Sequence, residues 1–339
     1  MRRHRYQAAH PRARGARRGT RTWHVPALAA ALAAVIAVVA IAAVWITRDG
    51  ADPPAAPGAL TARPNSYLGV YVDGVPASYA GIRSFAAATG VTPNVVSYYS
   101  GWLEQFRRSF ADNAARNGAV PLVQVDPTGI SMAAIASGRY DSYLISYARA
   151  VRALGGPVIV GFGHEMNAYW YTWGRGHTTP ADFVAAWRHM VDVFRDVGAT
   201  NVTWMWTVNA IDGHGGVPSP KPWWPGSRYV TWVGIDGYFR TPSEQFASVF
   251  GPTIAAVRSL TKAPILISET GAAPSADQPV KITSLFAGTR AYDLLGFVWF
   301  DVIASADYRM RSAAAVAAYR HGATTYRPAR MPDRQRSQR

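Results

Sequence analysis

The chain has 339 residues, 49% of them hydrophobic, and no cysteine. This length can form one large domain or two ordinary ones, and the lack of cysteine excludes disulfides, a thiol nucleophile and cysteine-ligated metals. The net charge of +15 is concentrated at the ends, because residues 1–26 carry eight arginines and no acid, and residues 327–339 carry a net +4. The middle of the chain keeps only about +3, so the basicity belongs to the tails.

An uncharged apolar run, ALAAALAAVIAVVAIAAVWI, occupies residues 27–46. A helix of this length is roughly 30 Å long, which matches the hydrocarbon core of a bilayer, so the run predicts a transmembrane segment. The arginine-rich residues 1–26 are then cytoplasmic, and everything after Ile46 is extracellular. Cleavage of the run as a long signal, which would give a secreted protein, stays open. We favour an uncleaved anchor, because no clear small-x-small site follows the run.

Two further segments have the composition of chain outside a folded core. Residues 47–65 are rich in Pro and Ala and predict an extended linker. Residues 326–339 are basic and predict a disordered tail, either a solubilising end or a contact with an anionic envelope polymer or lipid. A nucleic-acid partner is not expected, because the membrane segment puts one basic tail inside the cell and the other outside.

Residues 66–325 alternate between short β-branched or aromatic runs and longer amphipathic stretches, which is the pattern of βα units on a parallel sheet. The runs predict strands at 67–73, 94–100, 120–126, 157–165, 202–209, 230–239, 263–269 and 294–301. The amphipathic stretches predict helices, for example at 102–118, 140–156, 180–198 and 243–260. Eight such units fit a (β/α)8 (TIM) barrel of about 250 residues. A doubly wound sheet is the alternative, but no GxGxxG or GxxxxGK[ST] turn is present.

Nearly every predicted strand ends on a polar or aromatic residue. These residues are Asp73, Tyr98, Asp126, Glu165, Asn209, Asp236 with Tyr238, Glu269, and Trp299 with Asp301. In a barrel the carboxyl ends of the strands meet on one face, where the active sites of such proteins lie. We therefore expect these side chains to converge on one site.

The chain has four glutamates. Glu104 and Glu244 fall in the first turns of predicted helices, where a negative charge complements the helix dipole. Glu165 and Glu269 end the fourth and seventh strands, about three βα units apart, so they should face each other across the barrel mouth. A single carboxylate there could be an ion-pair partner. Two opposed carboxylates among Trp and Tyr residues indicate glycoside hydrolysis, in which one protonates the leaving oxygen and the other attacks the anomeric carbon or activates water.

The adjacent His164 and Glu165 do not indicate a metal site. A zinc-protease helix needs HExxH, but position 168 is Ala168 and the preceding residues predict a strand. No GxSxG motif supports a serine hydrolase. We expect no metal and no cofactor.

Four motifs follow one another along the predicted barrel: HEMNAYWYTWG (164–174), WWPGSRYVTWVGIDGYF (223–239), PILISETG (264–271) and FVWFD (297–301). The first three resemble the acid/base segment, the sixth-strand region and the nucleophile strand of glycoside hydrolase family 26, retaining (β/α)8 enzymes best known as β-mannanases. The resemblance covers roughly residues 66–323. It implies a polysaccharide substrate and no cofactor.

Carried over residue by residue, the resemblance makes Glu165 the acid/base and Glu269 the nucleophile. His164 would hydrogen-bond the sugar or the nucleophile. Tyr238 would donate a hydrogen bond to Glu269, with Asp236 nearby. The implied mechanism has two steps: formation of a covalent glycosyl-enzyme on Glu269, and its hydrolysis by water that Glu165 deprotonates.

Three tryptophans are the expected sugar contacts. By the same resemblance, Trp170 and Trp173 would be sugar platforms and Trp299 the floor of the central subsite. Sugar rings present apolar C–H faces, which aromatic side chains with flanking polar groups bind. Trp187 and Trp232 are expected in the core instead.

Departures from the family pattern leave the substrate open. Gly161 and Phe162 stand where the mannanases often carry Arg-Pro, and WTVN (206–209) replaces a Trp-Ser-Pro-Asn-like end of strand five. The first expectation is a retaining endo-β-glycanase acting on β-1,4-mannan. Mixed-linkage β-glucan, β-1,3-xylan and the cell's own exopolysaccharide are alternative substrates, and a non-catalytic polysaccharide-binding protein is the alternative from another class. The sequence does not indicate an oligomeric state.

Overall fold

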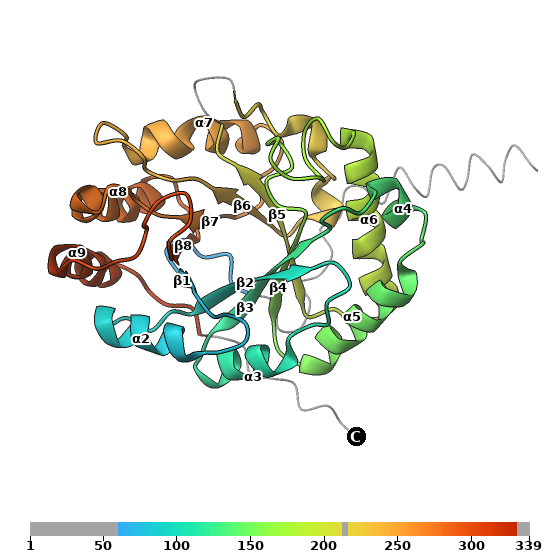
Figure 1. The fold of residues 1–339 in the computed structure, drawn as a ribbon, viewed down its shortest axis with the longest axis horizontal. Helices are drawn as coiled ribbons and strands as arrows, with labels where there is room; N and C mark the ends of the chain where they lie inside the picture. Colours follow the sequence, from blue (N-terminus) through green and yellow to red (C-terminus); the bar gives the residue numbers. More distant parts are fainter. Residues whose placement is uncertain (1–59, 212–215, 331–339) are drawn as a thin grey trace, which may run out of the picture. The chain divides into compact units, whose positions relative to one another are not determined.

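The computed structural model describes residues 60–211 and 216–330. Within them, eight parallel strands form a closed barrel in the order β1 to β8, with β8 pairing back to β1 (Figure 1). The strands are β1 Tyr67–Val72, β2 Val95–Gly101, β3 Val120–Asp126, β4 Val158–Phe162, β5 Val202–Asn209, β6 Trp232–Asp236, β7 Ile265–Thr270 and β8 Gly296–Asp301. The predicted (β/α)8 architecture is confirmed.

Helices surround the strands in Figure 1. They are α2 Ala80–Thr89, α3 Arg108–Arg116, α4 Met132–Ala136, α5 Asp141–Leu154, α6 Pro180–Asp196, α7 Phe246–Arg258, α8 Gln278–Ala291 and α9 Ala313–Ala323, with 3-10 turns η2 Lys221–Trp223, η3 Ser227–Tyr229 and η4 Ser275–Asp277. Their ends follow local chemistry: Thr179 caps α6 by accepting the Asp182 backbone N–H at 3.1 Å, and Gly155 ends α5 in the left-handed conformation.

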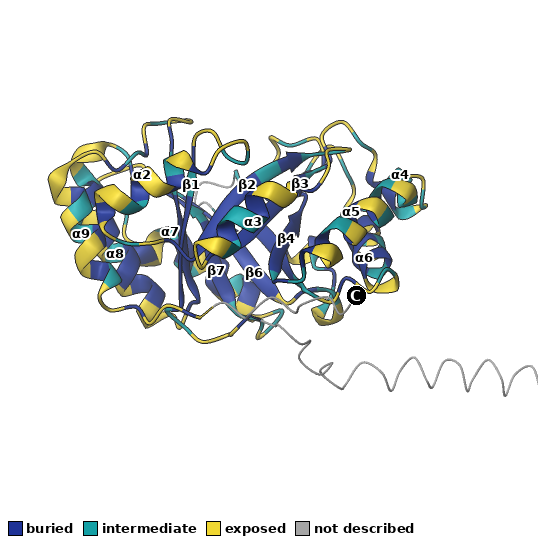
Figure 2. Ribbon diagram, turned by 90° about the horizontal axis from the view of Figure 1, so that it is seen from below, coloured by how far each residue is buried: buried dark blue, intermediate teal, exposed yellow. Residues whose placement is uncertain are grey.

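Successive side chains along the strands point to opposite sides of the sheet and so belong to two separate apolar clusters. One cluster draws only on strand residues and the segments that flank the barrel, for example Tyr67, Val95, Leu122 and Trp232, and it fills the barrel interior. The neighbouring residues on the same strands pack with helix side chains in the second, larger cluster. In Figure 2 the strands are buried on both sides and the helices are exposed on their outer faces. This arrangement is the one expected of a parallel barrel covered by helices.

The amino ends of the strands are closed by segments that the sequence analysis placed outside the barrel. Leu60 joins the interior cluster, and Ala329 donates its backbone N–H to the Ser66 carbonyl at 3.0 Å. Tyr326 is buried and its hydroxyl hydrogen-bonds Thr289 at 2.7 Å. The folded unit therefore extends beyond the predicted range 66–325 at both ends, because these apolar side chains cover the floor of the barrel.

The two glutamates that were assigned to helix first turns lie before the helices instead. Glu104 lies in the turn after β2 and pairs with Arg107 at 3.3 Å, since α3 begins only at Arg108. Glu244 precedes α7 and accepts backbone N–H groups of its own loop.

No helix in the described part of the chain is long and apolar enough to span a bilayer. The predicted transmembrane segment at 27–46, its basic flank 1–26 and most of the linker lie outside the described residues, as does the tail from residue 331.

Candidate active site

A cavity of about 520 Å³ opens at the carboxyl ends of the strands. Its walls come from all eight strands or the segments that follow them: Tyr71, Tyr99, Asp126, His164, Glu165, Trp170, Tyr171, Asn209, Tyr238, Arg240, Glu269, Phe300, Ala304, Ser305 and Tyr308. Glu165 and Glu269 thus share one cavity, as predicted from their positions in the chain.

Glu165 lies three residues past the end of β4, in the left-handed conformation with φ of 55°. Such a backbone costs a non-glycine residue about 1 kcal/mol or more, and it is retained where the surroundings hold it. Here the Glu165 backbone N–H donates to the Thr207 carbonyl at 3.0 Å. Its carboxylate accepts the Trp170 indole N–H and the Asn209 amide N–H, each at 2.6 Å. Both carboxylate oxygens are therefore oriented by fixed donors.

Glu269 ends β7 at an irregularity of the sheet. The register of β7 shifts against both neighbours, so Asp236 pairs with Glu269, and Thr270 pairs with Trp299. A bulge of this kind re-aims a side chain, and it turns Glu269 into the cavity directly after the inward-facing Ser268. The Tyr238 and Tyr99 hydroxyls donate to its two carboxylate oxygens.

Burial, followed by the negative charge of Glu165, raises the pKa of Glu269 to about 7. The hydrogen bonds from Tyr238 and Tyr99 and the charge of His164 act in the opposite direction and limit the rise. The pKa of Glu269 is therefore set by burial and by the charged and hydrogen-bonding groups around it.

His164 is buried under the cavity wall with both ring nitrogens occupied. Nδ1 lies 3.0 Å from Asp126 Oδ1, and Nε2 lies 3.1 Å from the Tyr171 hydroxyl. Burial by itself lowers the pKa of His164, but the charge and hydrogen bond of Asp126, together with Glu165, outweigh it and raise the pKa to about 10. The imidazolium therefore lies between carboxylates and partly offsets their negative charge.

Trp170 and Trp173 have different environments. Trp170 lies in the cavity wall with 44% of its surface exposed, and its neighbour Tyr169 is 58% exposed. Trp173 is buried behind the wall, where its indole N–H donates to the His164 carbonyl at 2.7 Å and its ring stacks on Tyr171 at 4.4 Å. The prediction that Trp173 is a sugar platform is wrong, because its ring supports the wall and does not reach the cavity.

Trp299 is also misplaced by the sequence prediction. Its side chain is completely buried among the residues between sheet and helices, and its indole N–H donates to the Tyr308 carbonyl at 3.1 Å. The next residue, Phe300, faces the cavity and stacks on Tyr71 with ring centroids 4.5 Å apart. Phe300 occupies the position that was expected for Trp299, because successive strand residues point to opposite faces.

Asp236 lies beneath the site and not in its wall. It is 1% exposed, and its Oδ1 accepts the Ser268 hydroxyl at 2.5 Å. Burial, then the charges of Glu269 and Glu165, raises the pKa of Asp236 well above its usual range. Asp236 was expected beside Tyr238 and Glu269 among the residues that contact the substrate, and the structure contradicts the contact, since Asp236 does not line the cavity.

Small residues beneath the site make room for a polar layer. Gln124 donates to the Thr207 hydroxyl at 3.0 Å, and a Cβ at Gly161 would come within 1.8 Å of the Gln124 amide oxygen. Gly161 is the position where the mannanases often carry arginine. In this chain the space above Gly161 is filled by Gln124.

The family 26 model, described as "Glycosyl hydrolase family 26", matches residues 138–307, about half of the chain. The chain belongs to glycosyl hydrolase family 26. The matched range contains His164, Glu165 and Glu269 and runs to the segment after β8. Tyr71, Tyr99 and Asp126, which β1 to β3 contribute to the cavity, lie before it.

Endoglucanase H of Acetivibrio thermocellus is 32% identical over 270 residues, covering 75% of this chain and 30% of that protein. A β-1,3-xylanase from a Vibrio species is 29% identical over 174 residues, covering 47% of this chain and 35% of that protein. The chain thus spans about a third of the length of these relatives. A family 26 β-mannanase from Bacteroides ovatus has the same fold, with a TM-score of 0.60 at 15% identity over 82% of this chain and 94% of that one.

The site of this family 26 chain includes aromatic residues that sequence reasoning missed. Tyr71, Tyr99, Tyr171, Phe300 and Tyr308 line the cavity. The sequence could have indicated Tyr99, because alternate residues of a strand point to the same side and Val95 and Ser97 of β2 point into the barrel. Tyr98 points outward and packs on Phe110. Three further predicted strand-end residues lie outside the cavity: Asp73, Tyr98 and Asp301.

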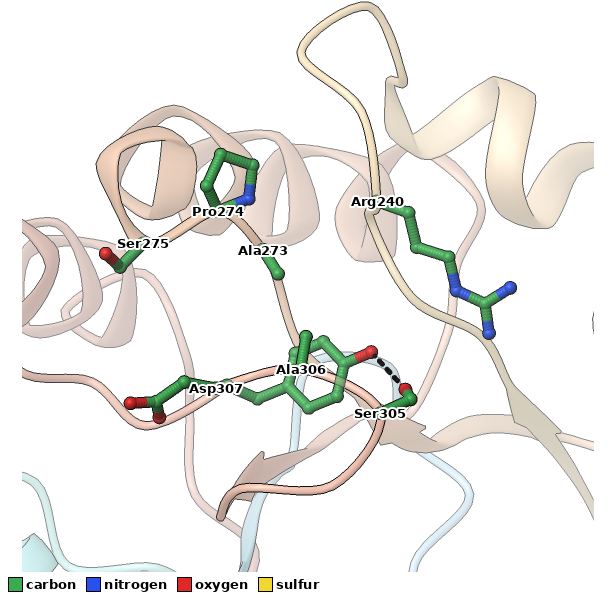
Figure 3. Close-up of a pocket in the computed structure, with 8 residues that line it drawn as sticks. Arg240, Ala273, Pro274, Ser275, Ser305, Ala306 and Asp307 are labelled. Carbon is green, nitrogen blue, oxygen red and sulfur yellow. Dashed lines mark hydrogen bonds between the residues drawn. The ribbon is translucent and has the colours of Figure 1, made fainter.

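Two more cavities adjoin the central one. A cavity of about 660 Å³ shares Arg240, Ser305 and Tyr308 with it (Figure 3). A cavity of about 450 Å³ shares Trp170, Asn209, Tyr238 and Arg240 with it and adds Tyr169. All three cavities share Arg240 and together form one groove on this face of the barrel, with the two glutamates in the central cavity.

Proposed function

We propose that the protein is a retaining endo-β-glycanase, with β-1,4-mannan-type polysaccharide as its first substrate. The observation that carries the proposal is the shared cavity of Glu165 and Glu269, whose carboxylates are held by different donors and surrounded by aromatic rings. Glycoside hydrolysis needs one carboxyl group as acid and a second as nucleophile or base. Family membership supports the same chemistry.

In the first step Glu165 protonates the glycosidic oxygen while a carboxylate oxygen of Glu269 forms a bond to the anomeric carbon and the glycosidic bond breaks. The Trp170 and Asn209 donors stabilise the carboxylate that Glu165 becomes. In the second step Glu165 takes a proton from water, the water oxygen bonds to the anomeric carbon, and Glu269 leaves as a carboxylate.

Tyr238, Tyr99 and His164 position the nucleophile and tune its charge. The two hydroxyls orient both oxygens of Glu269, and the imidazolium of His164 favours its ionised form. Phe300, stacked on Tyr71, offers an apolar surface for the sugar ring beside Glu269, and Trp170 offers one near Glu165.

Endo action is supported by the groove. Two further cavities adjoin the central one, the first through Ser305 and Tyr308 and the second through Trp170 and Asn209, and Arg240 lines all three. A polymer can pass through such a groove with sugar units on both sides of the cleaved bond. Mixed-linkage β-glucan and β-1,3-xylan are the next substrates to test, in keeping with the names of the endoglucanase and xylanase relatives.

We further propose that the barrel acts outside the cell, tethered through residues 27–46 or released after their cleavage. The uncharged apolar run and its arginine-rich flank support this placement. Protease treatment of intact cells is the measurement: digestion of the barrel without lysis is expected, and protection of the barrel would exclude the external location.

The activity is tested by product release from glucomannan, galactomannan, mixed-linkage β-glucan and β-1,3-xylan with the full chain in detergent. Glu269→Ala is the inactive control. We expect one polymer to be cut by the wild type and none by the variant, with products whose anomeric configuration, followed by NMR, is retained at the start of the reaction.

Two outcomes contradict parts of the proposal. Products of inverted configuration would leave a glycosidase but remove the covalent intermediate on Glu269. If the wild type and Glu269→Ala bind a polymer with equal affinity and neither cleaves it, the result would favour a non-catalytic polysaccharide-binding protein.

A further inference from the structure

Arg240 lies where the three cavities of the groove meet. It lines the central cavity with Glu165 and Glu269, and it also lines both neighbouring cavities. Across residues 60–211 and 216–330, the Arg240 guanidinium forms no hydrogen bond and no ion pair, and only its backbone N–H has a partner. A strong set of donors is therefore directed to solvent within the groove.

The backbone that carries Arg240 is held firmly in spite of this free side chain. The Glu244 carboxylate accepts the backbone N–H groups of Arg240 and Thr241. From α8, the ammonium group of the buried Lys281 donates to the Pro242 carbonyl at 2.6 Å and to the Glu244 carbonyl. Backbone N–H and carbonyl groups of the loop after β6 are thus both hydrogen-bonded. These contacts fix the backbone of Arg240 where the three cavities meet.

Other charges of the groove already have partners. Asp307, in the 660 Å³ cavity, binds both guanidinium arms of Arg309 at 2.8 and 2.6 Å. Asp126 pairs with His164. Figure 3 shows Arg240 on the side of the cavity opposite Asp307, with Ser305 between them. The positive charge of Arg240 is therefore not compensated by the acid of the same cavity.

An uncompensated guanidinium has a specific chemical preference. Its planar fork of N–H donors matches a carboxylate in a bidentate arrangement, and a charge-assisted pair is about twice as strong as a neutral hydrogen bond. A neutral sugar needs only uncharged donors, such as the Tyr71 hydroxyl of the central cavity.

We infer that the natural substrate is an acidic β-glycan, and that Arg240 binds a carboxylate on a sugar unit next to the one being cleaved. This inference rests on the proposed glycanase function and narrows its substrate class. Arg240 is then a specificity-determining residue, which favours uronate-bearing chains over neutral chains of the same backbone.

The test compares matched neutral and acidic polymers on the full chain in detergent. Glucomannan and mixed-linkage β-glucan are each used untreated and after partial oxidation of their C6 hydroxyls to carboxylates. Arg240→Gln removes the charge and keeps a hydrogen-bond donor, and Arg240→Lys keeps the charge. Arg149→Gln, an exposed arginine on α5, is the matched control.

We expect Arg240→Gln to lower kcat/KM on the oxidised polymer by roughly tenfold more than on the neutral one. Arg240→Lys keeps the charge but loses the bidentate fork, so it should retain only part of the preference for the oxidised polymer. Salt should reduce that preference. An equal loss on both polymers would overturn the inference, because it would show that Arg240 binds neutral hydroxyls. No effect on either polymer would overturn it as well.

Failure of the glycanase proposal is separable from failure of this inference. If no polymer is cut, retention of the oxidised polymers is measured by affinity electrophoresis. If Arg240→Gln binds the oxidised polymer more weakly than the wild type does but binds the neutral polymer equally well, the acidic ligand is supported without turnover. Unchanged binding of the oxidised polymer would reject the acidic ligand.

Discussion

Trp170 donates its indole N–H to Oε2 of Glu165, five residues earlier in the chain, at 2.6 Å. One side chain therefore contributes both to the apolar wall of the groove and to the hydrogen bonding of the proposed acid/base.

These two contributions of Trp170 can be separated by substitution. Trp170→Phe keeps an aromatic face and loses the donor, so we expect kcat to fall roughly tenfold with little change in KM. Trp170→Ala loses both and should also raise KM. Steady-state kinetics on the cleaved polymer measures this difference, and equal effects of the two variants would show that the indole N–H is unimportant.

The pH dependence of activity should report on Glu269. A nucleophile must be ionised, and the pKa of Glu269 is raised to about 7, so kcat/KM should decline as the pH falls through about 7. Tyr238→Phe and Tyr99→Phe each remove a hydrogen bond that lowers this pKa, so each should move the acid limb to higher pH.

Tyr98→Phe is the matched control for these hydroxyl deletions, because Tyr98 precedes Tyr99 but packs outward against Phe110. Its acid limb should coincide with that of the wild type. An acid limb that moves to lower pH in Tyr238→Phe would contradict the proposed hydrogen bond to ionised Glu269.

Asp236 should tolerate loss of its charge. Because its pKa is raised well above the usual range, the neutral isostere in Asp236→Asn should keep most of the activity. Asp236→Ala leaves the Ser268 hydroxyl without its acceptor and should lower the free energy of unfolding by about 1–3 kcal/mol. Urea unfolding and kcat of both variants test this, and a loss of activity of a hundredfold or more in Asp236→Asn would mean that the charged form is needed.

Stability should depend on pH through His164. Its pKa is raised to about 10 in the folded protein from 6.5, so the folded state holds a proton that the unfolded chain releases between these values. The stabilisation is fully present below pH 6.5 and is lost as the pH rises through 10. We expect the difference in unfolding free energy between wild type and His164→Gln to shrink over this range, and a difference that grows with pH would show that His164 is neutral.

Strand parity explains which site residues the sequence could and could not predict. The expected strands nearly coincide with the observed ones, except that β4 and β6 end at Phe162 and Asp236, before the predicted ends at 165 and 239. The agreement arises because β-branched runs, turns and helical stretches are local signals. Trp299 and Tyr98 were each chosen one position away from the residue that faces the cavity, and the alternation of Val95, Ser97 and Tyr99 could have corrected the second. The orientation of Trp299 could be predicted only by knowing that its neighbour Val298 points into the barrel interior.

Other features depend on tertiary structure alone. The bulge that turns Glu269 inward after Ser268 breaks the alternation, so parity by itself would have placed Glu269 outside. The burial of Trp173 follows from a loop that folds back on His164, and no local pattern of residues encodes that contact.

The floor of the barrel has a consequence for how the protein can be attached to a surface. Leu60 and Ala329 both meet the amino ends of the strands, so the chain enters and leaves the barrel on the face opposite the groove. A tether, a fusion partner or an immobilising tag at either end starts from this rear face. The groove lies on the opposite face of the barrel from both of these points.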